Sequence, residues 1–205
     1  MDKKSTPILA EIIKRRRTRK PAQFSKTPPS LDLVTELIEI ARHAPNHHRT
    51  EPARFYLLNR EKIQQLGKLF GETLVGDGKD PALVEKGNRK TREWGEAPGI
   101  ILVTCLTDES SDLALKNPAV IEEDYATCSC ICQNLLLLFE SENIASKWST
   151  GAVWKHPEFN QRIGIKDPEN ERVVGIIFYG YSEQQVPTRR LSSLFNHLIT
   201  CLLYT

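Results

Sequence analysis

The chain has 205 residues, of which 40% are hydrophobic and 26% are charged, a mix typical of a soluble globular protein with one core. The formal net charge of +2 is too small to indicate a nucleic-acid partner by itself. No apolar run approaches the roughly 18 residues of a membrane helix. The first apolar stretch precedes the basic cluster, which is the reverse of a signal peptide. We therefore expect a single cytoplasmic domain over residues 1–205, without a membrane partner.

The first half of the chain alternates helical patterns with turn signals. Apolar spacing predicts a helix over 8–16, which runs into a basic segment. After several prolines, Ser30 is a suitable N-cap for a second helix that reaches about residue 44. Residues 54–58 predict a short strand. Further helices are predicted over 60–70 and 80–94, separated by a glycine-containing turn.

The second half contains the longest apolar patterns. The run GIILVTCL after Pro98 predicts a strand that is buried on both faces. Residues 120–142 predict a long, central helix. A polar loop with Trp148, a short helix over 157–163 and a buried strand over 172–179 follow. Three clear strands at irregular spacing favour an α+β fold over a regular βαβ series.

Three of the five cysteines lie close together in the long predicted helix. Cys128 and Cys132 share one face of that helix, whereas Cys130 points nearly opposite. A tetrahedral zinc site requires ligands that converge. The spacing therefore favours buried thiols that pack in the core.

Familiar catalytic motifs are absent from the sequence, including GxGxxG, the P-loop lysine motif, HExxH and GxSxG. The first remaining feature is the run Arg15, Arg16, Arg17, Thr18 and Arg19. Guanidinium groups bind phosphate oxygens bidentately, and a hydroxyl adds a donor. The same run also fits a solvated basic surface, or a patch for nucleic acid or targeting.

A second feature is the polar segment from His43 to Pro52, directly after an amphipathic helix. Three of its residues are histidines, which are common metal ligands. However, His43, His47 and His48 straddle a proline, which breaks helical spacing, so we predict no metal site. A ligand-binding loop and an ordinary exposed turn fit this segment equally well.

Two further features follow in the second half of the chain. Trp148 offers a flat ring, Ser149 and Thr150 offer hydroxyls, and Gly151 allows a ligand to approach the backbone. An ordinary loop with a core tryptophan is the alternative. Arg189 and Arg190 follow the last strand, and alone they are typical of surface charge.

In this order, the features resemble the nitroreductase family, and especially its short-chain bacterial members. KRRRTRK resembles the family's RRS-x-R opening, and RHAPNHHRTEPARFYLL resembles its RAP…QPWRF segment. APGIILVTC and the stretch DYATCSCICQNLLLLFESENIASKW resemble its central strand and long helix. VVGIIFYGY followed by PTRR resembles the closing strand and basic turn. The resemblance covers nearly the whole chain.

The resemblance implies a mainly antiparallel sheet flanked by helices, in an intertwined homodimer with FMN at the interface. Arg15 and Arg17, with Arg16 beside them, would then hold the FMN phosphate and ribityl chain, with Arg189 or Arg190 adding to that site. His43 and His47 would reach FMN, in the partner's site. Trp148, Ser149, Thr150 and Gly151 would line the flavin.

The implied reaction is ping-pong hydride transfer from NADH or NADPH, through FMN, to a nitroaromatic or quinone acceptor, with no catalytic side chain required. Alternatives are a related flavoenzyme that catalyses dehydrogenation or flavin fragmentation, and a basic nucleic-acid or partner-binding module. The sequence also departs from the family pattern. Arg17 replaces a serine, Glu51 and Ala53 replace the glutamine and tryptophan of QPW, and Asn143 and Ala145 lie where glycines are common.

Overall fold

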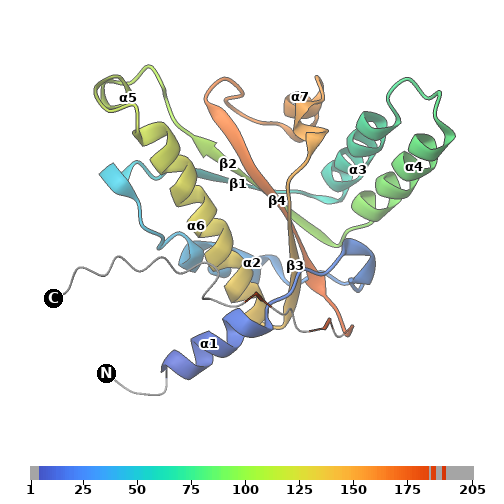
Figure 1. Ribbon diagram of the computed structural model, residues 1–205, viewed down its shortest axis with the longest axis horizontal. Helices are drawn as coiled ribbons and strands as arrows, with labels where there is room; N and C mark the ends of the chain where they lie inside the picture. The colour runs from blue at the N-terminus through green and yellow to red at the C-terminus, as the bar shows by residue number, and fades with distance from the viewer. Residues whose placement is uncertain (1–4, 185, 188–190, 193–205) are drawn as a thin grey trace.

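A four-stranded antiparallel sheet forms the centre of the molecule, with strand order β1-β2-β4-β3. The structure is a computed structural model, which describes residues 5–184, 186–187 and 191–192. Helices cover both faces of the sheet, so the expected α+β class is confirmed (Figure 1). Within the described residues, no helix is long and apolar enough to cross a membrane.

The elements agree closely with the hydrophobic patterns. The strands are β1 (Ala53–Leu57), β2 (Gly99–Leu106), β3 (Ile144–Ser149) and β4 (Glu171–Tyr181). The α-helices are α1 (Ser5–Arg15), α2 (Leu31–Ala41), α3 (Arg60–Val75), α4 (Pro81–Gly95), α5 (Asp112–Lys116), α6 (Val120–Ser141) and α7 (Phe159–Ile163). Short 3-10 turns occupy Pro21–Gln23, His47–Arg49 and Ala152–Lys155. Ser30 caps α2 as expected, because its hydroxyl accepts from the Leu33 N–H.

The strand β3 corrects the expectation of a polar loop around Trp148. Residues 144–149 pair antiparallel with β4, from Ile144 opposite Tyr181 to Ser149 opposite Ile176. Lys147 and two serines make the segment look polar, and it is only 6 residues long. Its burial comes from tertiary neighbours, which a local pattern does not show.

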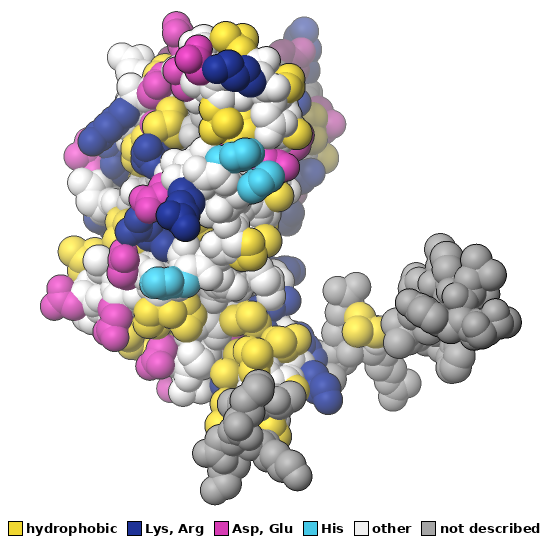
Figure 2. All heavy atoms as spheres, turned by 90° about the vertical axis from the view of Figure 1, so that its left-hand side faces the viewer, with side chains coloured by type: hydrophobic (Ala, Val, Ile, Leu, Met, Phe, Trp, Pro, Cys, Tyr) yellow, Lys and Arg dark blue, Asp and Glu magenta, His cyan; other side chains and the backbone are white. Residues whose placement is uncertain are grey.

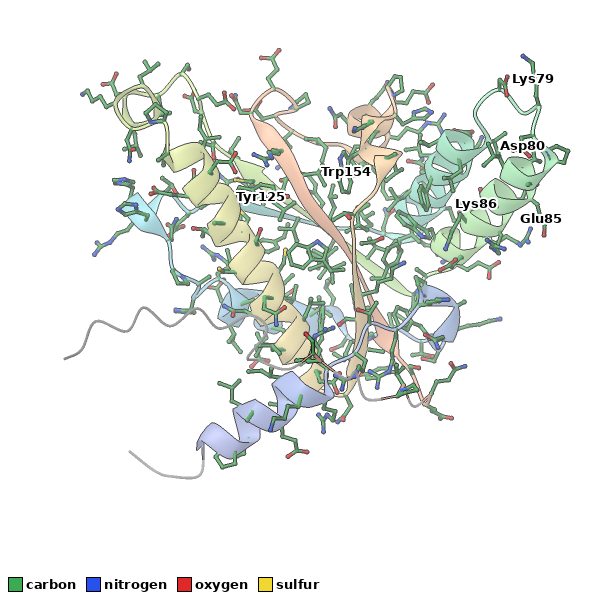
Figure 3. All side chains as sticks on the ribbon, in the orientation of Figure 1. Lys79, Asp80, Glu85, Lys86, Tyr125 and Trp154 are labelled. Carbon is green, nitrogen blue, oxygen red and sulfur yellow. The ribbon has the colours of Figure 1, made fainter. Side chains whose placement is uncertain are left out.

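Each face of the sheet has its own apolar core. On one face α2 and α6 pack against residues such as Ile101, Val103 and Ile177. On the other face α3, α4 and α7 pack against Ile100 and Phe178, among others. Tyr125 and Trp154 belong to opposite faces, and Figure 3 shows them beside α6 and α7, respectively.

The buried thiols follow the helical prediction. Cys128 and Cys132 of α6 are buried, whereas Cys130 is exposed. Burial raises the pKa of the Cys132 thiol to about 12. Buried thiols that stay protonated pack as small apolar groups.

Helices α3 and α4 form a close-packed hairpin at the edge of the second core. A Cβ at Gly67 would lie 2.5 Å from the backbone nitrogen of Gly95 and 2.6 Å from the Thr91 carbonyl oxygen. The helices therefore touch through their backbones at this point. Charged side chains lie away from the contact, and Figure 3 shows Lys79, Asp80, Glu85 and Lys86 at the outer end of the hairpin.

The close backbone contact makes Gly67 sensitive to substitution. Gly67→Ala should lower the free energy of unfolding by about 1–3 kcal/mol, because a methyl group would force the two backbones apart. Chemical denaturation measures this loss. Gly95→Ala is the matched control, since a Cβ there would lie 3.8 Å from the Gln64 Cα, an ordinary contact distance. Equal stabilities of the two variants would show that the backbone contact is not tight.

Candidate functional site

The arginine segment that follows α1 runs beside β3. Thr18 forms a parallel bridge with Ser146, and the Arg19 N–H donates to the Ser146 carbonyl at 3.1 Å. The segment therefore extends the edge of the sheet. Two of the sequence features, the arginine run and the Trp148 segment, lie next to each other in space.

A buried carboxylate on α6 holds two of these arginines. Arg15 donates from Nε to Glu140 Oε1 at 2.8 Å and from Nη2 to the Glu140 carbonyl at 3.0 Å. Arg19 Nη1 lies 3.5 Å from the second carboxylate oxygen, and the Glu140 side chain is only 7% exposed. Two arginines of the run are thus partly neutralised, which reduces the free charge of the basic segment.

Arg17 donates hydrogen bonds to two backbone carbonyl oxygens. Its Nη1 donates to the Arg16 carbonyl at 2.7 Å, and its Nε donates to the Pro187 carbonyl at 3.3 Å. The chain therefore returns to the arginine segment just before the basic turn. Arg189 and Arg190 themselves lie outside the described residues.

The side chains of β3 alternate between the two faces of the sheet. Trp148 packs towards α6, and its Nε1 would lie 2.0 Å from a Cβ at Gly175, so the indole lies across that glycine. Lys147 and Ser149 point to the opposite face, because they pair with Phe178 and Ile176. The structure therefore does not bring the side chains of Trp148 and Ser149 to one surface, although sequence reasoning grouped them. Ser149 is buried.

Lys147 is a half-buried cation that sequence reasoning missed. Desolvation lowers the pKa of its ammonium group, Glu93 opposes this shift, and Lys90 and Lys20 add to it. Its Nζ lies 5.7 Å from the centroid of the Phe178 ring. Lys90 and Lys20 thus repel the Lys147 ammonium group, and a bound anion would relieve that repulsion. Local sequence gave no signal, since these residues come from different elements.

Several polar atoms of this region have unused hydrogen-bonding capacity. Within the described residues, Arg19 Nε and Glu93 Oε1 are buried without a hydrogen-bond partner. Gly151 leaves space beside the ring of Phe70, which a Cβ would meet only at 4.0 Å. A ligand with an anionic group and several hydroxyls fits such a site, because buried polar groups require partners. The donor set is therefore compatible with FMN.

The histidine loop lies at the other end of α6. His47 Nδ1 contacts Glu123 Oε2 at 2.8 Å, whereas Arg15 contacts Glu140. The helix has 22 residues, so it is about 33 Å long at about 1.5 Å per residue. Within one chain, His47 and Arg15 are therefore near opposite ends of α6. His43, also exposed, follows the C-cap of α2 and lies four positions before His47.

The histidine face is polar and hollowed. Figure 2 shows histidine side chains among acidic and basic ones, with apolar side chains gathered towards the lower end. A cleft of about 490 Å³ lies between α2, β1 and α6, lined by Arg42, Arg49, Arg54 and Glu51 among others. A second cleft of about 810 Å³ lies between the segment 21–28 and α4.

The comparisons with known proteins identify the family. The nitroreductase family model matches residues 13–181. The chain is a member of the nitroreductase family. It is 30% identical over 178 residues to the Bacillus subtilis (strain 168) protein YfhC, which is named as an NAD(P)H nitroreductase, with 86% of each chain covered.

Solved structures confirm the nitroreductase fold. A nitroreductase-like protein from Bacillus cereus matches with a TM-score of 0.77 and 23% identity, covering 95% of this chain and 96% of that one. A Bacteroides fragilis nitroreductase with bound FMN matches with a TM-score of 0.67 and 22% identity, covering 96% and 97%. At these identities the likeness establishes the fold alone.

One departure from the family pattern has a clear structural basis. Asn143 follows α6 with a φ of 57°, a left-handed conformation that glycine and asparagine adopt most readily. Asparagine therefore suits this left-handed position without a glycine. Glu51 is also left-handed, with a φ of 47°, and its carboxylate contacts Arg42 at 3.3 Å. The structure gives no reason for Ala53 in place of tryptophan.

The contact with Glu140 should be important for the position of the arginine segment. Glu140→Gln removes the charge that pairs with Arg15 and Arg19. We expect a loss of about 2–3 kcal/mol in the free energy of unfolding, less than for a fully buried pair, because Arg15 is 45% exposed. Urea denaturation measures it. The exposed neighbour Glu142, changed to glutamine, should have almost no effect, and a similar loss there would contradict this assignment.

Proposed function

We propose that this nitroreductase-family protein is an FMN-dependent NAD(P)H oxidoreductase. The observation that supports it most strongly is the arginine segment along β3, with Lys147 and the end of β3 at the same sheet edge. These residues provide the donors that a flavin phosphate and ribityl chain require. The FMN and NAD(P)H named for its relatives agree with that chemistry.

Each residue near the edge of β3 has a proposed role. Arg17 binds the phosphate, because its contacts are carbonyl oxygens and leave the positive charge unneutralised. Arg15 positions the arginine segment and does not contact the phosphate directly, because its guanidinium group is already bound to Glu140. Ser149, Thr150 and the Gly151 backbone border the flavin ring, whereas Trp148 supports the strand from the α6 side. The remaining positive charges around the phosphate come from Arg16 and from either Arg189 or Arg190.

Bound FMN supplies hydride transfer from NAD(P)H to a small acceptor. The chain contributes binding, orientation and charge. Lys147 and Arg19 can stabilise negative charge electrostatically, because both are largely removed from solvent. We propose nitroaromatic or quinone acceptors, as the name of the relative YfhC suggests.

We also propose that the protein is a homodimer, and the exposed apolar side chains of the structure support this proposal. The apolar residues of α6, such as Leu135 and Phe139, are buried within the chain. Exposed apolar side chains instead lie on α1, where Ile8 is 61% exposed, Leu9 53% and Ile13 51%. Such a face on a helix that projects from the body is typical of an interface. The apolar tail 194–205 lies outside the described residues.

The site is proposed to be shared between subunits. His47 and the arginine segment lie at opposite ends of α6, so one FMN molecule could not easily contact both within a chain. In a symmetric dimer, the partner's loop can approach the arginine segment of the first chain. His43 lies close to the same loop and would take part in the same way.

The colour of the purified protein tests the flavin proposal directly. We expect a yellow protein with about one FMN per subunit. NADPH or NADH added without oxygen should remove the visible absorbance, and a nitroaromatic acceptor should restore it. A coloured protein that NAD(P)H does not reduce would favour the dehydrogenation or fragmentation chemistry. A colourless protein that FMN cannot restore would contradict the proposal.

Arg17→Ala is the sharper variant for phosphate binding, because Arg15→Ala would also remove the closer of the two arginine partners of the buried Glu140. Losing one charge-assisted contact costs about 1.5–3 kcal/mol, which is roughly ten- to hundredfold in FMN affinity. Fluorescence titration of FMN-free protein measures that affinity. Lys14→Ala, which removes an exposed charge nearby, is the control. An Arg17→Ala variant with unchanged affinity would exclude the proposed role.

Mixed dimers test whether the site is shared. Arg17→Ala and His47→Ala should each weaken FMN binding. A heterodimer of the two would contain one site with both defects and one site with neither. Subunit exchange should therefore restore up to half of the sites in each heterodimer, measured as bound flavin. If exchange is verified and no flavin binding returns, His47 does not act across the interface.

A further inference from the structure

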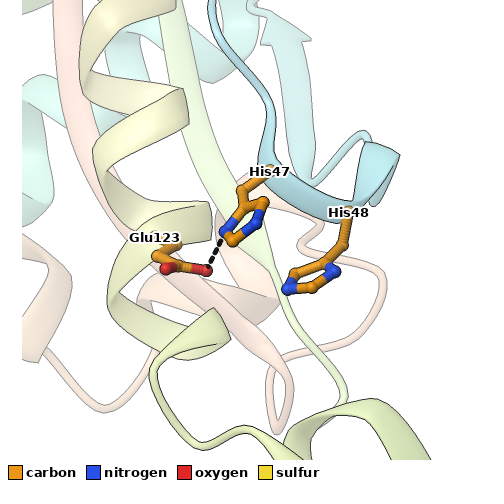
Figure 4. Close-up of side chains that lie close together, drawn as sticks. All are labelled: His47, His48 and Glu123. Carbon is orange, nitrogen blue, oxygen red and sulfur yellow. Dashed lines mark hydrogen bonds and ion pairs between the residues drawn. The ribbon is translucent and has the colours of Figure 1, made fainter.

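Two consecutive histidines meet a glutamate of α6 outside the arginine segment. His47 Nδ1 lies 2.8 Å from Glu123 Oε2, and the ring centroids of His47 and His48 are 4.0 Å apart. Figure 4 shows the two rings beside the carboxylate, which comes from a separate helix. One possible ligand atom from each residue lies within 4.8 Å of the other two.

The backbone of the loop directs both imidazoles to the same side. Successive side chains of an extended segment point in opposite directions. Here His48 has a φ of 60° and Arg49 a φ of 55°, and such left-handed non-glycine residues are rare and cost of order 1 kcal/mol each. This conformation brings the second ring beside the first.

Buried contacts hold the loop against α6. The Thr50 hydroxyl donates to the carboxylate of Asp124, which is 2% exposed. The Thr127 hydroxyl donates to the Pro45 carbonyl at 3.0 Å. Asn117 Nδ2 lies 3.2 Å from His48 Nε2 and so orients that ring. The two histidines are therefore carried by a loop that is fixed at both ends, beside the helix that carries Glu123.

From the sequence we predicted no metal site in this segment, but that prediction could not include Glu123 of α6. We propose that His47, His48 and Glu123 form a binding site for a divalent transition-metal ion, with Zn²⁺ as the best fit. Two imidazole nitrogens and a carboxylate oxygen are a common zinc ligand set, with water in the fourth position. In a tetrahedral site with bonds of about 2.0–2.1 Å, neighbouring ligand atoms lie closer than 4.8 Å. Exposed side chains can rotate to close that gap, and His47 is 62% exposed.

The metal site and the flavin site share one residue without excluding each other. His47 uses Nδ1 towards Glu123, and its second ring nitrogen remains available for another contact. His48 and Glu123 have no role in the proposed flavin site. Changes at these two residues therefore test the metal separately from FMN.

Zinc titration of the FMN-loaded, full-length protein tests the site. We expect one Zn²⁺ per subunit by calorimetry, with the stoichiometry checked by elemental analysis after dialysis. His48→Asn and Glu123→Gln should each weaken zinc binding at least tenfold, because even outer-shell changes weaken metal sites by about ten- to hundredfold. Asparagine is chosen at position 48 because it tolerates the left-handed conformation.

Two controls keep the outcome clear. His156→Ala removes a histidine from another part of the chain and should leave zinc affinity unchanged. The flavin absorbance of His48→Asn should equal that of the wild type, which separates loss of metal from loss of FMN. Zinc binding that persists in both His48→Asn and Glu123→Gln, or the absence of zinc binding by the folded wild type, would overturn the proposal.

Discussion

The buried carboxylate of Glu140 determines where the first part of the chain lies. An almost fully buried negative charge requires positive partners, and Arg15 and Arg19 supply them from the two ends of a five-residue stretch. With both ends held, the backbone between them lies against the edge of β3. The position of the arginines proposed to bind the flavin phosphate therefore depends on a buried carboxylate of α6.

The two faces of the sheet differ in character near β3. On the α6 face, side chains such as Trp148 are packed and largely inert. On the α4 face, the cationic Lys147 is half-buried and interacts electrostatically with Lys90 and Glu93, which are held to each other at 2.5 Å. Placing cations where solvent is scarce costs stability. The same cations attract an anionic ligand strongly. Binding sites commonly lose some folding stability in return for such ligand affinity.

Sequence patterns predicted the helices and the central strands well, because their burial is periodic. The β2 boundaries agree residue for residue, and Cys128 and Cys130 point to opposite sides of α6 as expected. The strand β3 was missed because Lys147 interrupts its apolar pattern. The pairing of His47 with Glu123, 76 positions away, has no local signal at all. The arginine run was visible in the sequence, but its neutralisation by Glu140 was not.

The contact between Trp148 and Gly175 limits which substitutions these two positions can accept during evolution. The indole occupies the space that any side chain at position 175 would need, at 2.0 Å from the position of a Cβ. A larger residue at 175 is tolerable only if the ring at 148 becomes smaller, and a smaller ring at 148 leaves a void that a side chain at 175 can fill. Among related proteins we therefore expect these two positions to vary together, so that the total volume of their side chains stays nearly constant.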